Sequence, residues 1–302
     1  MMIQKMSRFA CSMGMLAAVV CVDYVQGASL PVTSGLLVHL DGSSIVDDGN
    51  GNVIGWNDIS GNGLNATGTG ELVSGATPNG ENAVSFDGSA QFLEIGASTL
   101  FDTASGDLTW IVVFKADLLA NDRMVGFGYG DIDPDPGTTV LSASALESMS
   151  HASNGYRTSG REQNNDFDVA NTPGTLSAGI YFIGISQLDS ANDLMISSVT
   201  DAAGTTTTGD SSADADLSNL ALNGHLYTRL AASGSGKTDT DPGNFFDGEI
   251  AEFIVYDRKL SVAEATSVGT HLYNKHIAIP EPASASVIAL MGLMMLRRKN
   301  SV

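Results

Sequence analysis

Aspartates beside glycine and asparagine are the residues of this sequence best suited to bind a ligand. Asp58 opens the stretch Asp-Ile-Ser-Gly-Asn-Gly, Asp41 precedes Gly42 and Asp87 precedes Gly88. Hard cations prefer carboxylate and carbonyl oxygens, and such loops offer both, so we expect calcium as cofactor, with Asp58 first and Asp41 or Asp87 as alternative ligands. Asp before Gly is also common in ordinary turns, which is the competing interpretation.

Nucleophilic and transition-metal chemistry finds little support in the sequence. The five histidines are scattered, none at a metal-ligand spacing from another, and are better explained as core or surface residues: His39, His151, His225, His271 and His276. No Gly-x-Ser-x-Gly elbow occurs. Gly234–Thr238 resembles a phosphate loop, but Ala231 replaces its first glycine.

Charge and composition narrow the function further. The 302 residues carry 34 acids against 14 lysines and arginines, a formal charge of −20, which disfavours nucleic acid as a partner. The 34 glycines favour many tight turns over long helices, so we expect an all-β domain.

The N-terminus has the pattern of a secretory signal peptide. Lys5 and Arg8 precede an apolar stretch over 9–22, and Val25-Gln26-Gly27 provides small or branched residues for a peptidase. We expect residues 1–27 to be removed after Gly27, and a buried N-terminal helix is the alternative. Both cysteines, Cys11 and Cys21, lie in this segment, so the mature chain would have neither disulfides nor thiol chemistry.

The C-terminus predicts membrane sorting. Residues 283–296 are mostly apolar and, as a helix, would span roughly 21 Å, short of the roughly 30 Å hydrocarbon core. The flanking residues are Pro280, Glu281 and Pro282 before the stretch and Arg297, Arg298 and Lys299 after it. The basic cluster would stay cytoplasmic and leave the preceding domain outside.

This C-terminal arrangement resembles the PEP-CTERM sorting signal of exported bacterial proteins. The resemblance implies that residues 277–302 anchor the protein transiently to the membrane through a transmembrane-type helix. It also implies that an exosortase-type enzyme processes this segment and that the protein is released to the cell surface or the extracellular matrix. An ordinary tail anchor is the alternative.

Residues 28–276 alternate short apolar runs with turns, as in a sandwich or barrel. The polar segments 147–175 and 205–216 read as loops, and Phe92–Ile95 is expected to pair with Ala83–Phe86 across a turn. Ser261 and Glu264 form a capping box that predicts a helix to about Lys275. The expected strands are Leu36–Leu40, Val53–Trp56, Ala83–Phe86, Phe92–Ile95, Leu108–Lys115, Met124–Tyr129, Tyr181–Leu188, Leu194–Thr200, Leu226–Ala231 and Glu249–Tyr256.

Four segments give this core a family resemblance. They are Leu37-Val38-His39-Leu40-Asp41, the run 56–63 that reads Trp-Asn-Asp-Ile-Ser-Gly-Asn-Gly, the run 83–88 that reads Ala-Val-Ser-Phe-Asp-Gly, and the closing run 246–261 from Phe-Asp-Gly-Glu to Lys-Leu-Ser. Together they resemble the LamG, or concanavalin A-like lectin/glucanase, superfamily. The resemblance implies a two-sheet antiparallel jelly roll, with first and last strands adjacent and one short C-terminal helix, and a calcium ion at the rim in many members.

The resemblance also directs attention to catalytic carboxylates. Glucanases of this superfamily carry Glu-x-Asp-x-x-Glu on one strand, and the nearest run here is Glu249-Ile250-Ala251-Glu252, which lacks the middle acid. Its odd spacing predicts that the two glutamates face opposite sides of the strand. Trp56 and Trp110 are expected to be buried, and Tyr129 and Tyr156 are better placed to reach solvent.

These observations predict an exported protein that is not an enzyme and binds a polysaccharide or another extracellular polymer. Two alternatives stay open. One is a structural matrix component without a specific ligand, and the other is a diverged polysaccharide-active enzyme.

Overall fold

A computed structural model describes residues 29–103, 106–119, 122–130, 144–151, 155–161, 167–174, 176–211, 217, 220, 222–234 and 242–278. The expected signal peptide with its cleavage site at Gly27, and the sorting residues from Pro280 to Lys299, lie outside this part of the chain. Within it, no helix is both long and apolar enough to cross a membrane.

The described chain is mostly β-structure, which confirms the expected all-β class. Its strands are β1 (Leu36–Asp47), β2 (Asn52–Asp58), β3 (Ala66–Ala76), β4 (Asn82–Asp87), β5 (Phe92–Gly96), β6 (Leu108–Ala116), β7 (Arg123–Tyr129), β8 (Ser144–His151), β9 (Gly155–Arg161), β10 (Phe167–Asn171), β11 (Tyr181–Asp189), β12 (Leu194–Thr200), β13 (Thr206–Asp210), β14 (His225–Leu230), β15 (Ser233–Gly234), β16 (Pro242–Gly243) and β17 (Asp247–Tyr256). A short 3-10 helix, η1, spans Thr99–Phe101.

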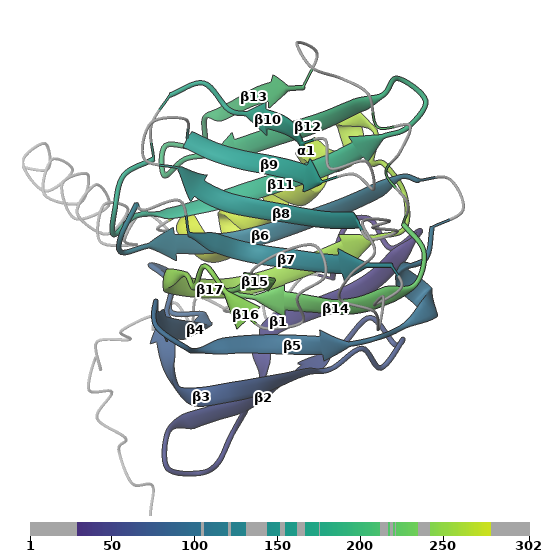
Figure 1. Ribbon diagram of the computed structural model, residues 1–302. Helices are drawn as coiled ribbons and strands as arrows, with labels where there is room; N and C mark the ends of the chain where they lie inside the picture. The colour runs from purple at the N-terminus through teal and green to yellow at the C-terminus, as the bar shows by residue number, and fades with distance from the viewer. Residues whose placement is uncertain are drawn as a thin grey trace, which may run out of the picture.

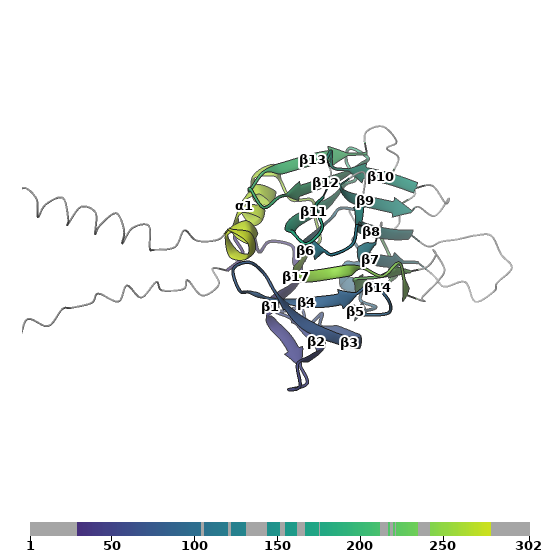
Figure 2. The ribbon, with the colours of Figure 1, turned by 90° about the vertical axis from the view of Figure 1, so that its left-hand side faces the viewer.

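Nearly all of these strands join one continuous antiparallel sheet. Its order is β10-β9-β8-β7-β14-β5-β3-β2-β1-β17-β6-β11-β12-β13, with β4 paired to β17 and β3. The sheet curls over so that a front layer of β5, β14 and β7 to β10 faces a back layer of β1, β17, β6 and β11 to β13 (Figures 1 and 2). The first and last long strands, β1 and β17, are adjacent as expected. The expected pairing of β4 with β5 is wrong, because β5 pairs with β14 and β3.

The core lies on both sides of the back layer. In β6, Trp110, Val112 and Phe114 point between the two layers, whereas Ile111 and Val113 point outward to a second apolar cluster. All five are fully buried, because β6 lies between β17 and β11 with apolar residues packed against both of its faces. The outer cluster is closed by a helix, α1 (Val262–Leu272), followed by a π-helical turn, η2 (Tyr273–Ile277) (Figure 2).

The start of α1 follows the sequence signal closely. Ser261 Oγ accepts from the backbone N–H of Glu264, whose carboxylate accepts from the N–H of Ser261, and this completes the capping box. Val268, Gly269 and Leu272 face the back layer. Val262, in the first turn, is 86% exposed.

Four strands were expected to be loops. The segments 147–175 and 205–216 contain most of β8 and all of β9, β10 and β13. Serine, threonine and charged residues are frequent in β8, β9 and β13, and β10 carries Asp168 and Asn171. Part of this polarity is buried in a hydroxyl chain between the layers: Ser186 Oγ lies 2.8 Å from Tyr156 Oη and 2.6 Å from Thr158 Oγ1. Because these hydroxyls satisfy one another, polar strands can face the core.

The close packing of the layers predicts a sensitive glycine. A methyl group on Gly184 of β11 would lie 2.4 Å from the ring of Tyr156, which is fully buried. Gly184→Ala is therefore expected to lower the free energy of unfolding by about 2 kcal/mol through overpacking. Urea unfolding measures this, with Gly96→Ala as control, because nothing lies within 4 Å of the added methyl there. Equal stability of the two variants would contradict this packing.

Candidate functional site

Strand β17 turns two glutamates to the same face of the back layer. Its register against β6 shifts between Ile250 and Glu252, so Ala251 is the extra residue of a β-bulge. Ile250 and Phe253 point into the core between the layers, whereas Ala251 and Ile254 point outward. The expectation that Glu249 and Glu252 face opposite sides is wrong, because a bulge changes the alternation of side chains by one residue.

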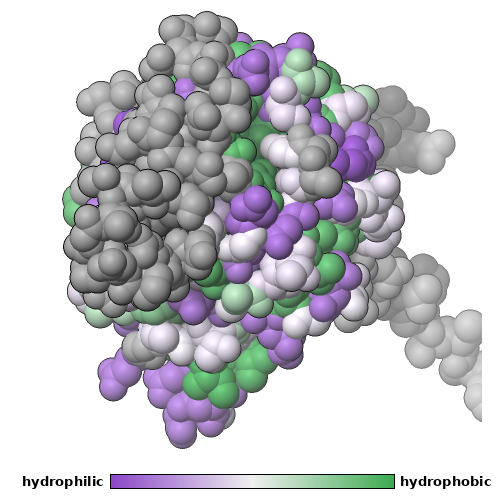
Figure 3. Space-filling view, turned by 45° about the vertical axis from the view of Figure 1, so that its right-hand side comes forward, coloured by the Kyte–Doolittle hydropathy of each residue, from purple (hydrophilic) through white to green (hydrophobic). Residues whose placement is uncertain are grey.

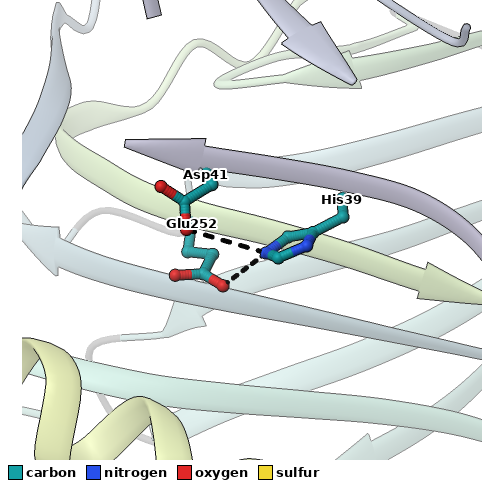
Figure 4. Close-up of side chains that lie close together, drawn as sticks. All are labelled: His39, Asp41 and Glu252. Atoms are coloured by element: carbon teal, nitrogen blue, oxygen red, sulfur yellow. Dashed lines mark hydrogen bonds and ion pairs between the residues drawn. The ribbon is translucent and has the colours of Figure 1, made fainter. Parts of the chain in front are cut away.

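Glu252 is the centre of a buried ionic cluster. His39 Nε2 lies 2.8 Å from its Oε1, His276 Nε2 lies 2.7 Å from its Oε2, and Lys275 Nζ lies 2.6 Å from the same oxygen. Lys275 also pairs with Asp41, whose carboxylate lies 3.9 Å from His39 Nε2. Figure 4 shows His39 and Asp41 of β1 beside Glu252 of β17. Since Lys275 and His276 belong to η2, the cluster ties the first strand to the last and to η2.

The cluster keeps its carboxylates ionised although it is shielded from water. The side chain of Glu252 is 1% exposed and that of His276 is 0% exposed. Burial acts to raise the pKa of Glu252, but hydrogen bonds from His276 and His39 and the charge of Lys275 outweigh it and hold the pKa well below 4.5. Burial and Glu252 act to raise the pKa of Asp41, and Lys275 lowers it overall.

The shifted pKa of Glu252 predicts loss of stability in acid. A carboxylate whose pKa is lower in the folded state stabilises the fold above its ordinary value of 4.5 and loses this contribution as pH falls further. We expect the free energy of unfolding to drop steeply below about pH 4.5. Urea unfolding from pH 7 to pH 3 measures it. A Glu252→Gln variant should show a shallower drop, and identical pH profiles would contradict the assignment.

The geometry of this cluster also bears on metal binding. One donor atom each from His39, Asp41 and Glu252 lies within 4.8 Å of the other two, which is close enough to hold a cation. The ammonium group of Lys275, however, already pairs with both carboxylates. The chain thus supplies its own cation, and the arrangement anchors the C-terminal helical segment to the sheet.

Glu249 forms a second, more accessible cluster on the same face. Its Oε1 accepts from Lys115 Nζ at 2.7 Å, and its Oε2 accepts from the hydroxyl of Tyr181. Burial, then the hydrogen bond to Glu249 and its charge, raise the pKa of Tyr181 far above its ordinary value, so this hydroxyl stays protonated. Neither cluster was predicted from the sequence.

The predicted calcium ligands do not converge. Asp58 ends β2, where its carboxylate accepts from the backbone N–H groups of His39, Ser60 and Leu64. Asp87 ends β4 and accepts from Ser89. Asp41 belongs to the Glu252 cluster. Each of these carboxylates thus already accepts hydrogen bonds or an ion pair from the chain itself.

Aromatic residues are distributed differently from the prediction. Trp56 and Trp110 are fully buried as expected, but so are Tyr129 and Tyr156, which were expected to reach solvent. On the front layer, the guanidinium carbon of Arg229 lies 3.9 Å from the ring centroid of Tyr227 and 5.5 Å from that of Phe92. On the face that Figure 3 draws, the described hydrophobic residues lie in patches among hydrophilic ones.

The chain matches no protein-family model and no curated protein. Several solved structures share its fold. Domain 4 of AbnA, an extracellular GH43 arabinanase of Geobacillus stearothermophilus solved with arabinotriose, is 15% identical with a TM-score of 0.51, over 78% of this chain and 98% of that one. The binding domain of botulinum neurotoxin serotype D is 11% identical with a TM-score of 0.50, and the match covers 80% of this chain and 52% of that one.

A Trypanosoma rangeli sialidase solved with sialic acid is 14% identical with a TM-score of 0.47, over 83% of this chain and 35% of the sialidase. This chain thus spans about half or less of the neurotoxin and sialidase chains. The expectation that it is not an enzyme is contradicted, because the solved structures that resemble it include parts of enzymes. At these identities the likeness to the arabinanase domain and to the neurotoxin binding domain shows a shared β-fold.

Proposed function

We propose that this protein is exported and that its β-domain binds a glycan at the cell surface or in the extracellular matrix. The observation that carries the proposal is the correspondence with nearly the whole of an isolated domain solved with arabinotriose. The two-layer arrangement and the adjacency of β1 and β17 support the finer assignment to a LamG-like jelly roll over 28–276.

Export and sorting complete the proposal. Residues 1–27 act as a signal peptide, and residues 277–302 act as a PEP-CTERM signal that an exosortase-type enzyme processes. The C-terminal helix anchors the protein to the membrane only until this step. Edman sequencing and intact mass of the protein recovered from its host test this part. The expected mature chain starts at Ala28 and lacks Arg297, Arg298 and Lys299, and an unprocessed chain at either end would contradict it.

Retention on polysaccharides tests the binding function. Full-length protein in mild detergent is passed over immobilised debranched arabinan, xylan, cellulose and polygalacturonate, once with calcium and once with chelator. We expect retention on at least one of them. Loss of retention with chelator would support calcium, with Asp58, Asp41 and Asp87 as the first residues to replace, and unchanged retention would remove calcium from the proposal.

Release of reducing ends during the same incubations would show that the bound polysaccharide is also cleaved. Failure of the protein to be retained on every matrix would overturn the binding function.

A further inference from the structure

A groove runs beside α1 on the outer side of the back layer. It has a volume of about 780 Å³ and is lined by residues of β11 to β13, α1 and the segments next to them. Figure 2 shows α1 lying beside these strands. Its size falls within the range of small-molecule sites, about 300–1,000 Å³. Every residue that lines it belongs to the described part of the chain.

The floor of the groove is apolar and one wall carries hydroxyl groups. Ile185, Ile196 and Leu260 contribute apolar surface. On the strand side, Ser198 Oγ lies 2.9 Å from Thr208 Oγ1, and Thr200 Oγ1 lies 2.8 Å from Thr206 Oγ1. Residues two apart in a strand share a face, so these pairs form two successive rungs along the groove. Each hydroxyl can donate as well as accept a hydrogen bond.

The helix side adds exposed side chains and an aromatic ring. Val262 and Thr266 line the groove from α1, and both are exposed. The ring of Tyr273 lines the end near Gly204, with its hydroxyl 3.3 Å from the carbonyl oxygen of Ala202, to which it donates. This hydrogen bond holds the Tyr273 ring in position, and the ring still lines the groove.

The groove is nearly uncharged although the protein is strongly acidic. Of its lining residues only Asp210 and Lys259 are charged, and the whole chain has a formal charge of −20. The negative charge of the protein would repel a polyanion, and the groove offers it a single cationic side chain, Lys259. A neutral polyhydroxylated chain fits better, because its C–H faces can cover the apolar floor and the Tyr273 ring while its hydroxyls bond to the rungs.

We propose that this groove is the binding site for a neutral polysaccharide. The inference rests on the proposed function and gives it a location. The site lies on the outer side of the back layer beside α1, away from the stack of Arg229, Tyr227 and Phe92 on the front layer. It requires no metal ion and no charged ligand.

Groove-filling variants test this location. Thr208→Trp on the strand wall and Thr266→Trp on the helix wall each place a large ring in the groove from an exposed position. The probe is the neutral polysaccharide that retains the wild type most strongly, with debranched arabinan tried first, and affinity electrophoresis gives the dissociation constant. We expect both variants to weaken binding at least 10-fold, about 1.4 kcal/mol. Thermal melting verifies that they fold.

Two control variants separate the groove from other surfaces. Ile54→Trp changes a 51% exposed position on β2 and should leave binding unchanged. Phe92→Ala removes one ring of the front-layer stack and should also leave binding unchanged. Folded groove variants that bind like wild type, or loss of binding in Phe92→Ala alone, would overturn the location and leave the proposed function standing.

Two further results bear on the proposal: which polymers the wild type binds, and whether another part of the chain occupies the groove. A wild type that binds only polygalacturonate would also overturn the neutral-glycan site. A wild type that binds no polysaccharide would overturn the proposed function itself. The competing occupant is the chain's own segment 279–302. If hydrogen exchange of residues 194–210 is slower in protein that has this segment than in protein without it, and polysaccharide does not slow it, the groove belongs to the segment and the proposal is overturned.

Discussion

Replacing Glu252 by glutamine is expected to lower the free energy of unfolding by about 3–5 kcal/mol, because it removes the charge from a buried ionic cluster. In the folded protein this carboxylate accepts from His39, His276 and Lys275 and is 1% exposed. The glutamine keeps the shape but cannot balance the buried ammonium group. Part of the loss reflects Lys275, which would retain only Asp41 as an anionic partner.

Urea unfolding at pH 7 measures the effect, and Glu71→Gln is the matched control. Glu71 is exposed on β3, where removal of one surface charge should change stability by no more than about 0.5 kcal/mol. A loss of less than about 1 kcal/mol in Glu252→Gln would contradict an anchoring role for this cluster.

Replacing Lys275 by methionine is expected to cost about 3 kcal/mol and to create a metal-responsive protein. Without the ammonium group, the carboxylates of Asp41 and Glu252 would face each other beside His39, with donor atoms within 4.8 Å of one another. Imidazole and carboxylate groups are ligands for Zn²⁺, which would replace the lost positive charge.

Thermal melting with and without Zn²⁺ measures this second prediction. The melting temperature of the variant should fall in the absence of metal and recover partly with Zn²⁺, whereas the wild type should not respond. His39→Asn in the Lys275→Met background removes one of the three ligands and should abolish the recovery. An equal rise for the wild type would mean that Lys275 does not occupy the cation position.

Much of the fold could be predicted from the apolar pattern. The ten expected strands correspond to β1, β2, β4 to β7, β11, β12, β14 and β17, in which apolar residues recur on at least one face. The strands β8 to β10 and β13 escaped prediction because polar side chains interrupt their apolar pattern, and some of the hydroxyl groups in β9 pair with others in the core. Ser197 Oγ, for example, donates to Thr158 Oγ1 at 2.5 Å in the core. Because buried positions in these strands can be polar, their sequences lack the alternation of apolar and polar residues that predicts a strand.

The ionic cluster could not be assembled from sequence for two physical reasons. His39 and Glu252 are 213 residues apart and meet only because β1 pairs with β17. The bulge at Ala251 then brings Glu252 onto the outer face, and nothing in the local sequence specifies it. One signal was present: Glu252 interrupts an otherwise apolar run from Ile250 to Tyr256, where an unpaired charge would be costly.

Polysaccharide binding by the intact protein can be measured by depletion. Increasing amounts of insoluble neutral polysaccharide are added to full-length protein, and the protein left in solution is measured at low and at high salt. We expect saturable depletion with debranched arabinan or another neutral polymer, little changed by salt because the groove is nearly uncharged. Depletion by no neutral polymer, or depletion only by polyanions and only at low salt, would contradict it.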